Sequence, residues 1–151
     1  MTAVVAIPDI RRKRLVFGGD AAVTACGDMF IPAPPKVRRA GGYLLGSAGD
    51  GAWFSMLAAV EWPVVPSLGY PEVGLVRDLR DAAKRLGIDE AGGSSLLGAI
   101  VEGVPRLWSF ESSLMVDAVP TGAFAAIGSG AAPALGVMFA TKTATPERRA
   151  R

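Results

Sequence analysis

The sequence predicts an α+β fold in four layers, an α-β-β-α sandwich, and the order of its segments is the main reason. β-rich segments occupy the first fifty residues, two helical segments follow, β-rich segments return at residues 96–127, and a helix comes next. Strands and helices therefore come in blocks and do not alternate, which favours α+β over a doubly wound parallel sheet. We expect residues 1–151 to form a single domain, because this length can bury one sizeable core.

The first third of the chain supplies the predicted first sheet. Residues 2–7 and 15–18 are β-rich runs, and the polar segment between them is typical of a hairpin connection. Residues 21–26 could extend this sheet, and residues 43–47 are again strand-like. The proline-rich residues 31–35 cannot lie in a central strand, because proline has no N–H to donate to a ladder.

Two helices are predicted after this sheet. Asp50 is a candidate N-cap, and apolar residues recur behind it at helical spacing as far as Val60, before Pro63. Pro71 suits the first turn of a second helix, and Gly87 suits its end. We expect the buried face of the second helix to consist of Val73, Val76, Leu79, Ala83 and Leu86.

A second sheet is predicted from four short β-rich segments separated by glycine, serine or proline. These segments are residues 96–101, 105–110, 114–116 and 124–127. Ser129 and Gly130 then open an alanine-rich helix at about residues 131–141, for which Ser129 is the simplest N-cap. Thr145, Pro146 and Glu147 have the pattern of a further helix start.

The composition excludes several classes of site. The chain has no histidine, which excludes Ser-His-Asp and Cys-His nucleophiles. Cys26 is the single cysteine, so no intrachain disulfide can form, and nitrogen and sulfur ligands are too few for an ordinary zinc centre. We expect Cys26 to be a small buried thiol, and we expect no cofactor and no metal.

Charge and hydropathy limit the partners. The formal net charge is only +2, and three short basic runs, at residues 11–14, 36–39 and 148–151, are typical of solvated turns. Without interleaved aromatics or a known motif, we expect no nucleic-acid partner. No apolar stretch approaches the ~18 residues of a membrane span, and no basic segment precedes the first apolar run. We therefore expect a cytoplasmic protein with no membrane partner.

Thr2 is the first candidate for chemistry. Small residues after an initiator methionine normally permit removal of Met1, which would leave Thr2 with a free α-amine. An α-amine has an ordinary pKa of about 8, so part of it is neutral near pH 7 and can accept a proton. The Thr2 hydroxyl would then be a nucleophile with a built-in base, although a threonine here is common and alone carries little weight.

Four later residues could support Thr2, and each also has a purely structural interpretation. Asp20 is either a solvated turn residue or an acid that faces the chain start. Lys36 is either part of a solvated basic run or lies beside the Thr2 hydroxyl, held there by Asp20. In the second case its positive charge would favour the alkoxide form of Thr2. Gly46 opens a strand-to-helix turn. Its glycines either serve packing alone, or the backbone N–H groups of the turn face an anion. Ser129 caps a helix or forms a supporting hydrogen bond in the site.

In this order, the motifs resemble the proteasome β-subunit superfamily of N-terminal-nucleophile hydrolases, and most of all the bacterial HslV-type peptidase. Five motifs carry the resemblance and span nearly the whole chain. They are Thr-Ala-Val-Val-Ala from Thr2, Gly-Gly-Asp-Ala-Ala-Val-Thr from Gly18, Pro-Lys-Val-Arg-Arg from Pro35, Gly-Ser-Ala-Gly-Asp-Gly from Gly46 and Ala-Ile-Gly-Ser-Gly-Ala from Ala126. The resemblance implies the four-layer sandwich, with the last C-terminal elements of the family missing from this sequence.

The resemblance also implies a threonine-type peptidase that cleaves unfolded polypeptides through an acyl-enzyme ester. By position, Thr2 matches the nucleophile, and Asp20 and Lys36 match the supporting acid and the lysine that tunes the base. Gly46 matches the backbone N–H of an oxyanion hole, and Ser129 matches a serine near the nucleophile's amine. A homo-oligomeric ring and a separate ATPase unfoldase are the implied partners.

Two other functions stay open at this point. The chain could be a non-catalytic subunit that keeps the sandwich and the ring contacts as a structural or binding element. It could also be a small-amide hydrolase that uses the same Thr2 chemistry without a closed chamber.

Overall fold

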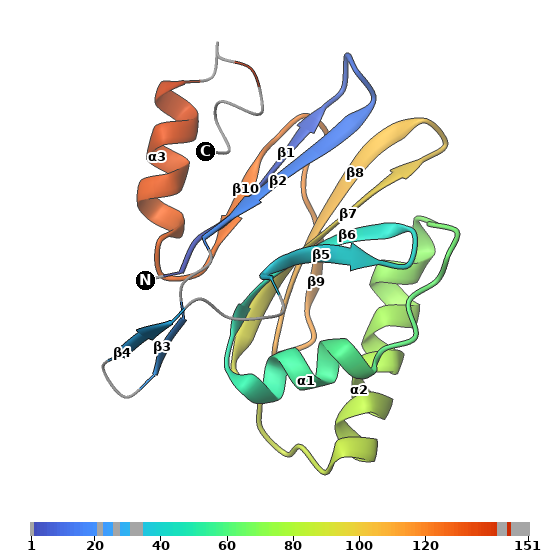
Figure 1. Ribbon diagram of the computed structural model, residues 1–151. Coiled ribbons are helices and arrows are strands. Elements are labelled where there is room, and N and C mark those ends of the chain that lie inside the picture. Colours follow the sequence, from blue (N-terminus) through green and yellow to red (C-terminus); the bar gives the residue numbers. More distant parts are fainter. Residues whose placement is uncertain (1, 21–22, 26–27, 31–34, 142–144, 146–151) are drawn as a thin grey trace.

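The computed structural model describes residues 2–20, 23–25, 28–30, 35–141 and 145. Four layers follow one another in Figure 1: helix α3 (Ala131–Ala140), a three-stranded sheet, a five-stranded sheet, and a pair of helices, α1 (Gly51–Ala59) and α2 (Leu75–Leu86). The predicted α-β-β-α sandwich is confirmed.

The smaller sheet has the order β10-β1-β2 and is antiparallel throughout. β1 (Val4–Asp9) and β2 (Arg14–Gly19) form the predicted hairpin, whose turn is held by a bond of 3.2 Å from the Arg12 N–H to the Asp9 carboxylate. β10 (Ala125–Ile127) completes the sheet. The prediction that this last strand belongs to a second sheet with residues 96–116 is therefore wrong.

The larger sheet has the order β5-β6-β7-β8-β9, again antiparallel. Its strands are β5 (Val37–Ala40), β6 (Tyr43–Gly49), β7 (Gly93–Val101), β8 (Val104–Glu111) and β9 (Val116–Ala118). The two predicted strand blocks therefore share one sheet across the intervening helices. The physical reason is that most of β6 is buried, so its N–H and C=O groups need a ladder partner on both edges.

One predicted extension of the first sheet is also wrong. Among the described residues, β3 (Val23–Ala25) pairs with β4 (Asp28–Phe30) in a two-stranded ribbon and not with either of the large sheets. Cys26, the prolines of residues 31–34, Pro146 and the last basic run lie outside the described residues.

The predicted positions of the two helices are confirmed, but the predicted buried face of the second helix is partly wrong. The Asp50 carboxylate accepts a bond of 2.8 Å from the Trp53 N–H and caps α1, and Gly87, at φ +63°, ends α2. A π-helical turn, η1 (Tyr70–Gly74), precedes α2. Because a π turn holds more residues than an α turn, the predicted face is rotated, and Val73 is 75% exposed. Leu79 is buried as predicted and Ala83 packs against the core, but the other buried residues of α2 are Leu75 and Ala82.

Successive side chains of β1 point to opposite faces of the smaller sheet. Val4 and Ala6 pack against Leu96 and Leu107 of the larger sheet, in the core between the layers. The intervening Val5 and Ile7 pack against Met138 of α3. Thr2, two residues before Val4, therefore begins on the side of the larger sheet. No helix among the described residues is long and apolar enough to cross a membrane.

Candidate active site

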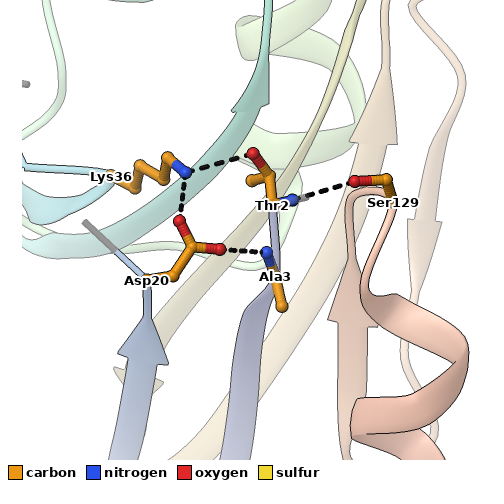
Figure 2. A network of polar contacts seen from close by, with 5 residues as sticks. All are labelled: Thr2, Ala3, Asp20, Lys36 and Ser129. Carbon is orange, nitrogen blue, oxygen red and sulfur yellow. Dashed lines mark hydrogen bonds and ion pairs between the residues drawn. The ribbon is translucent and has the colours of Figure 1, made fainter. Parts of the chain in front are cut away.

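Backbone contacts on two sides hold Thr2 at the start of β1. The Thr2 carbonyl oxygen accepts a bond of 2.7 Å from the Gly130 N–H, which comes from the loop before α3. On the other side, the Asp20 N–H donates to the Ala3 carbonyl at 3.1 Å, and the Ala3 N–H donates to the Asp20 carboxylate (Figure 2). The chain start is therefore held between the end of β2 and the loop that follows β10.

Lys36 contacts the Thr2 hydroxyl directly. Its Nζ lies 3.1 Å from Thr2 Oγ1 and forms an ion pair with the Asp20 carboxylate (Figure 2). The side chain of Lys36 is only 3% exposed, so the expectation of a solvated basic run is wrong at this residue. Burying an ammonium group costs several kcal/mol unless a partner compensates, which is the part that Asp20 plays here.

Ser129 contacts the other reactive group of Thr2. Its Oγ accepts a bond of 2.8 Å from the Thr2 N–H (Figure 2), and the N-cap of α3 is Gly130, with no side-chain bond. The expectation that Ser129 caps the helix is therefore wrong. The turn at Gly128, with φ +88°, brings this loop so close to Thr2 that any Cβ at position 128 would lie 2.4 Å from the Thr2 carbonyl oxygen.

Gly46 is the one predicted site residue that the structure does not bring to Thr2. It lies in the middle of β6, paired with Val37 on one side and Leu96 on the other. The next N–H, of Ser47, donates to the Lys36 carbonyl at 2.9 Å, so by alternation the Gly46 N–H faces the β7 ladder. Gly46 has a packing role instead, because a Cβ there would lie 2.5 Å from a methyl group of Val4.

An open cleft of about 510 Å³ lies beside Thr2. Its walls come from the ends of three strands of the larger sheet and from the loop before α3. The lining residues are Thr2, Ala48, Gly49, Gly93, Ser94, Glu111, Gly128 and Ser129. Gly49 belongs to a motif that the sequence analysis singled out. Ser94 and Glu111 carried no signal of their own, because only strand register brings them here.

Asp50 joins two of the strand ends that form this cleft. Its carboxylate accepts bonds of 2.8 Å from the Trp53 N–H and 2.7 Å from the Gly92 N–H. These hydrogen bonds, from Trp53 first and Gly92 second, hold the pKa of the Asp50 carboxyl below its ordinary value. The Asp50 N–H in turn donates to the Gly92 carbonyl at 2.8 Å, so the end of β6 and the segment before β7 are fixed together.

The site as a whole places a hydroxyl, a backbone nitrogen, an ammonium and a carboxylate within one network. Within residues 2–20, 23–25, 28–30, 35–141 and 145, no group of three or more His, Cys, Asp or Glu side chains could hold a metal ion. The arrangement is suited to nucleophilic attack by Thr2 Oγ1 with proton transfer to a nearby amine.

Solved structures with a similar fold are proteasome-like proteins. BPH from Thiobacillus denitrificans, in complex with epoxomicin, matches with a TM-score of 0.73 and 20% identity, covering 96% of this chain and 81% of that chain. Eukaryotic HslV from Trypanosoma brucei matches with a TM-score of 0.66 and 18% identity, covering 99% and 86%. Anbu, the ancestral β-subunit, from Yersinia bercovieri matches with a TM-score of 0.70 and 16% identity, covering 92% of this chain and 65% of that chain, just under two thirds. No protein-family model and no curated protein sequence matches.

Proposed function

Because the chain has the fold of the proteasome β-subunit superfamily, we propose that it is a threonine-type peptidase whose nucleophile is Thr2. One observation carries the proposal: each reactive group of Thr2 has a partner from a distant part of the chain. Oγ1 lies 3.1 Å from Lys36 Nζ, and the nitrogen lies 2.8 Å from Ser129 Oγ. Met1 lies outside the described residues, so its removal is part of the proposal.

The first half of the reaction forms an ester. The free α-amine of Thr2 takes the proton from Oγ1 as Oγ1 attacks the carbonyl carbon of a peptide bond. The Lys36 ammonium stabilises the negative charge that develops on Oγ1, and Asp20 holds that ammonium in place. The tetrahedral intermediate then breaks its C–N bond, and the leaving amine takes the proton from the Thr2 ammonium.

The second half returns the enzyme to its starting state. A water molecule gives a proton to the Thr2 amine and attacks the ester carbon, after which Oγ1 leaves and recovers that proton. The Ser129 hydroxyl can both accept and donate a hydrogen bond, so it can stay bonded to the amine in either protonation state.

Gly49 supplies the backbone N–H for the oxyanion in this proposal. Ser47 and Gly49 are two residues apart on β6, so their N–H groups point to the same side of the strand, away from β7. The Ser47 N–H is bonded to Lys36, which places that side next to the Thr2 support, and Gly49 itself lines the cleft. Donors of this kind typically contribute about 10²-fold or more to the rate.

Epoxomicin, which BPH binds, is the probe for the test. After expression in a bacterial cytoplasm, we expect the intact mass to show loss of Met1 and one epoxomicin adduct per chain. The adduct should vanish in Thr2→Ala and persist in Thr121→Ala, because Thr121 lies on an exposed turn and does not line the cleft. Retention of Met1 with no adduct would instead favour a non-catalytic subunit.

The proposal extends to assembly and substrate. Large apolar side chains are exposed on two separate regions, with Val64 at 82%, Val65 at 79% and Phe139 at 66%, which is typical of surfaces that pack between subunits. We therefore propose a homo-oligomer that acts on unfolded polypeptide, and light scattering in solution would test the assembly. A separate ATPase partner and a cytoplasmic location stay predictions from the sequence.

A further inference from the structure

A carboxylate that the proposed chemistry does not use lies in the cleft beside Thr2. Of the lining residues described, only Glu111 has a charged side chain, and it is exposed. Across the described residues, its carboxylate has neither a hydrogen-bond partner nor an ion-pair partner. Packing and capping therefore do not account for a charge at this place.

Strand register turns this carboxylate towards Thr2. Ala48, Ser94 and Glu111 are directly opposed on β6, β7 and β8, so their side chains form a row on one face of the larger sheet. It is the face towards the smaller sheet, because Leu96, two residues from Ser94, lies in the core between the sheets. Thr2 begins on the same side.

The spacing of this row gives the distance from Glu111 to the part of the cleft beside Ala48. Opposed Cβ atoms lie about 5 Å apart, so the Cβ of Glu111 lies roughly 10 Å from that of Ala48 at the other end of the row. An extended peptide advances about 3.3 Å per residue. A polypeptide lying across Thr2 would therefore bring a side chain next to Glu111 within about three residues of the scissile bond.

Neighbouring charges do not cancel that of Glu111. The Lys36 ammonium is 3% exposed and is paired with Asp20, so it faces inward and not into the open cleft. The Asp50 carboxylate is directed at the Trp53 and Gly92 N–H groups. Among the lining residues that the structure describes, Glu111 is therefore the one that presents a charge to a substrate in the cleft.

We propose that Glu111 selects polypeptides with a lysine or arginine close to the scissile bond. This inference rests on the proposed function, because it takes the cleft as the place where the peptide binds. An exposed ion pair of about 0.4–1 kcal/mol corresponds to a two- to fivefold difference in affinity. The preference should decrease as ionic strength rises, because exposed charges are screened.

Peptide binding to the Thr2→Ala variant, which lacks the proposed nucleophile, tests the selectivity of the cleft separately from catalysis. Three pools of dye-labelled seven-residue peptides are used, one each for lysine, glutamine and glutamate. Within a pool, the residue is placed in turn at each position of an otherwise identical peptide. Fluorescence anisotropy should show lysine peptides binding two- to fivefold more tightly than glutamine peptides, and glutamate peptides binding more weakly. Adding Glu111→Gln should remove the difference, and Glu111→Lys should reverse it.

Glu102→Gln is the matched control, because it removes the same charge from the turn at the far end of the β7–β8 hairpin. It should leave the preference intact. Equal binding of the lysine and glutamate peptides, an absence of peptide binding, or a preference that survives Glu111→Gln would overturn the inference. The epoxomicin adduct on the unmutated chain reports the proposed function separately, so either can fail while the other holds.

Discussion

Gly128 fixes the position of Thr2, and Gly128→Ala should displace the nucleophile. At φ +88°, the residue lies in a region that alanine avoids, and an added Cβ would lie 2.4 Å from the Thr2 carbonyl oxygen. Real Cβ contacts essentially never fall below 3.0 Å, so the two groups must separate by about 0.6 Å. The Gly130 N–H bonds the same oxygen at 2.7 Å, so the loop cannot move away without straining this bond.

The cost has two parts. Left-handed backbone costs alanine about 1–2 kcal/mol, and overpacking adds about 1–3 kcal/mol. We therefore expect Gly128→Ala to lower the free energy of unfolding by about 2–5 kcal/mol. A misplacement of about 1 Å can cost 10²-fold in rate, so a shift of about 0.6 Å should slow adduct formation at Thr2 by roughly tenfold or more.

Gly122→Ala separates the cost of the left-handed backbone from the cost of overpacking. Gly122 has a φ of +84°, but a Cβ there would meet nothing within 4 Å. This variant should lose only about 1–2 kcal/mol and should react with epoxomicin at the unmutated rate. Urea denaturation gives the stabilities, and time-resolved intact mass gives the modification rates at a temperature where all three proteins are folded.

Two results would refute this reasoning. Equal losses of stability in Gly128→Ala and Gly122→Ala would mean that the Cβ at position 128 meets no real obstacle. An unchanged rate of adduct formation in a folded Gly128→Ala variant would mean that this glycine does not position Thr2.

Three further predictions concern the residues around the cleft. Lys36→Met should slow epoxomicin modification by about 10²-fold or more by mass spectrometry, whereas exposed Lys84→Met should not. Gly46→Ala should cost about 1–3 kcal/mol in urea denaturation because its Cβ would lie 2.5 Å from a Val4 methyl, and a cost near zero would contradict the packing role. The Asp50 pKa is lowered by bonds from backbone N–H groups, so its contribution to stability is present above the ordinary carboxyl pKa of 3.8 and is lost as pH falls through the lower folded value. Stability measured below about pH 4 should therefore fall less steeply in Asp50→Asn than in the unmutated chain, and identical slopes would exclude this role.

Several elements were predictable because their signals are local. The hairpin of β1 and β2, the Asp50 cap and the stop at Gly87 each depend on residues within a few positions of one another. The residues alone left Asp20 and Lys36 as either surface residues or supports of Thr2, and the resemblance in motif order favoured the second alternative. The structure brings these three residues together.

The sequence by itself determined the fold class, the positions of most elements and three candidates around Thr2, namely Asp20, Lys36 and Ser129. Only the tertiary structure decided that β6 pairs with β7, that β10 joins β1, and that Ser129 bonds the Thr2 nitrogen and does not cap α3. It also decided that Gly46 packs inside the sheet and that Glu111 reaches the cleft. The physical reason is that local patterns determine helices, caps and turns, whereas contacts between distant segments depend on which sheet edges and faces remain to be covered.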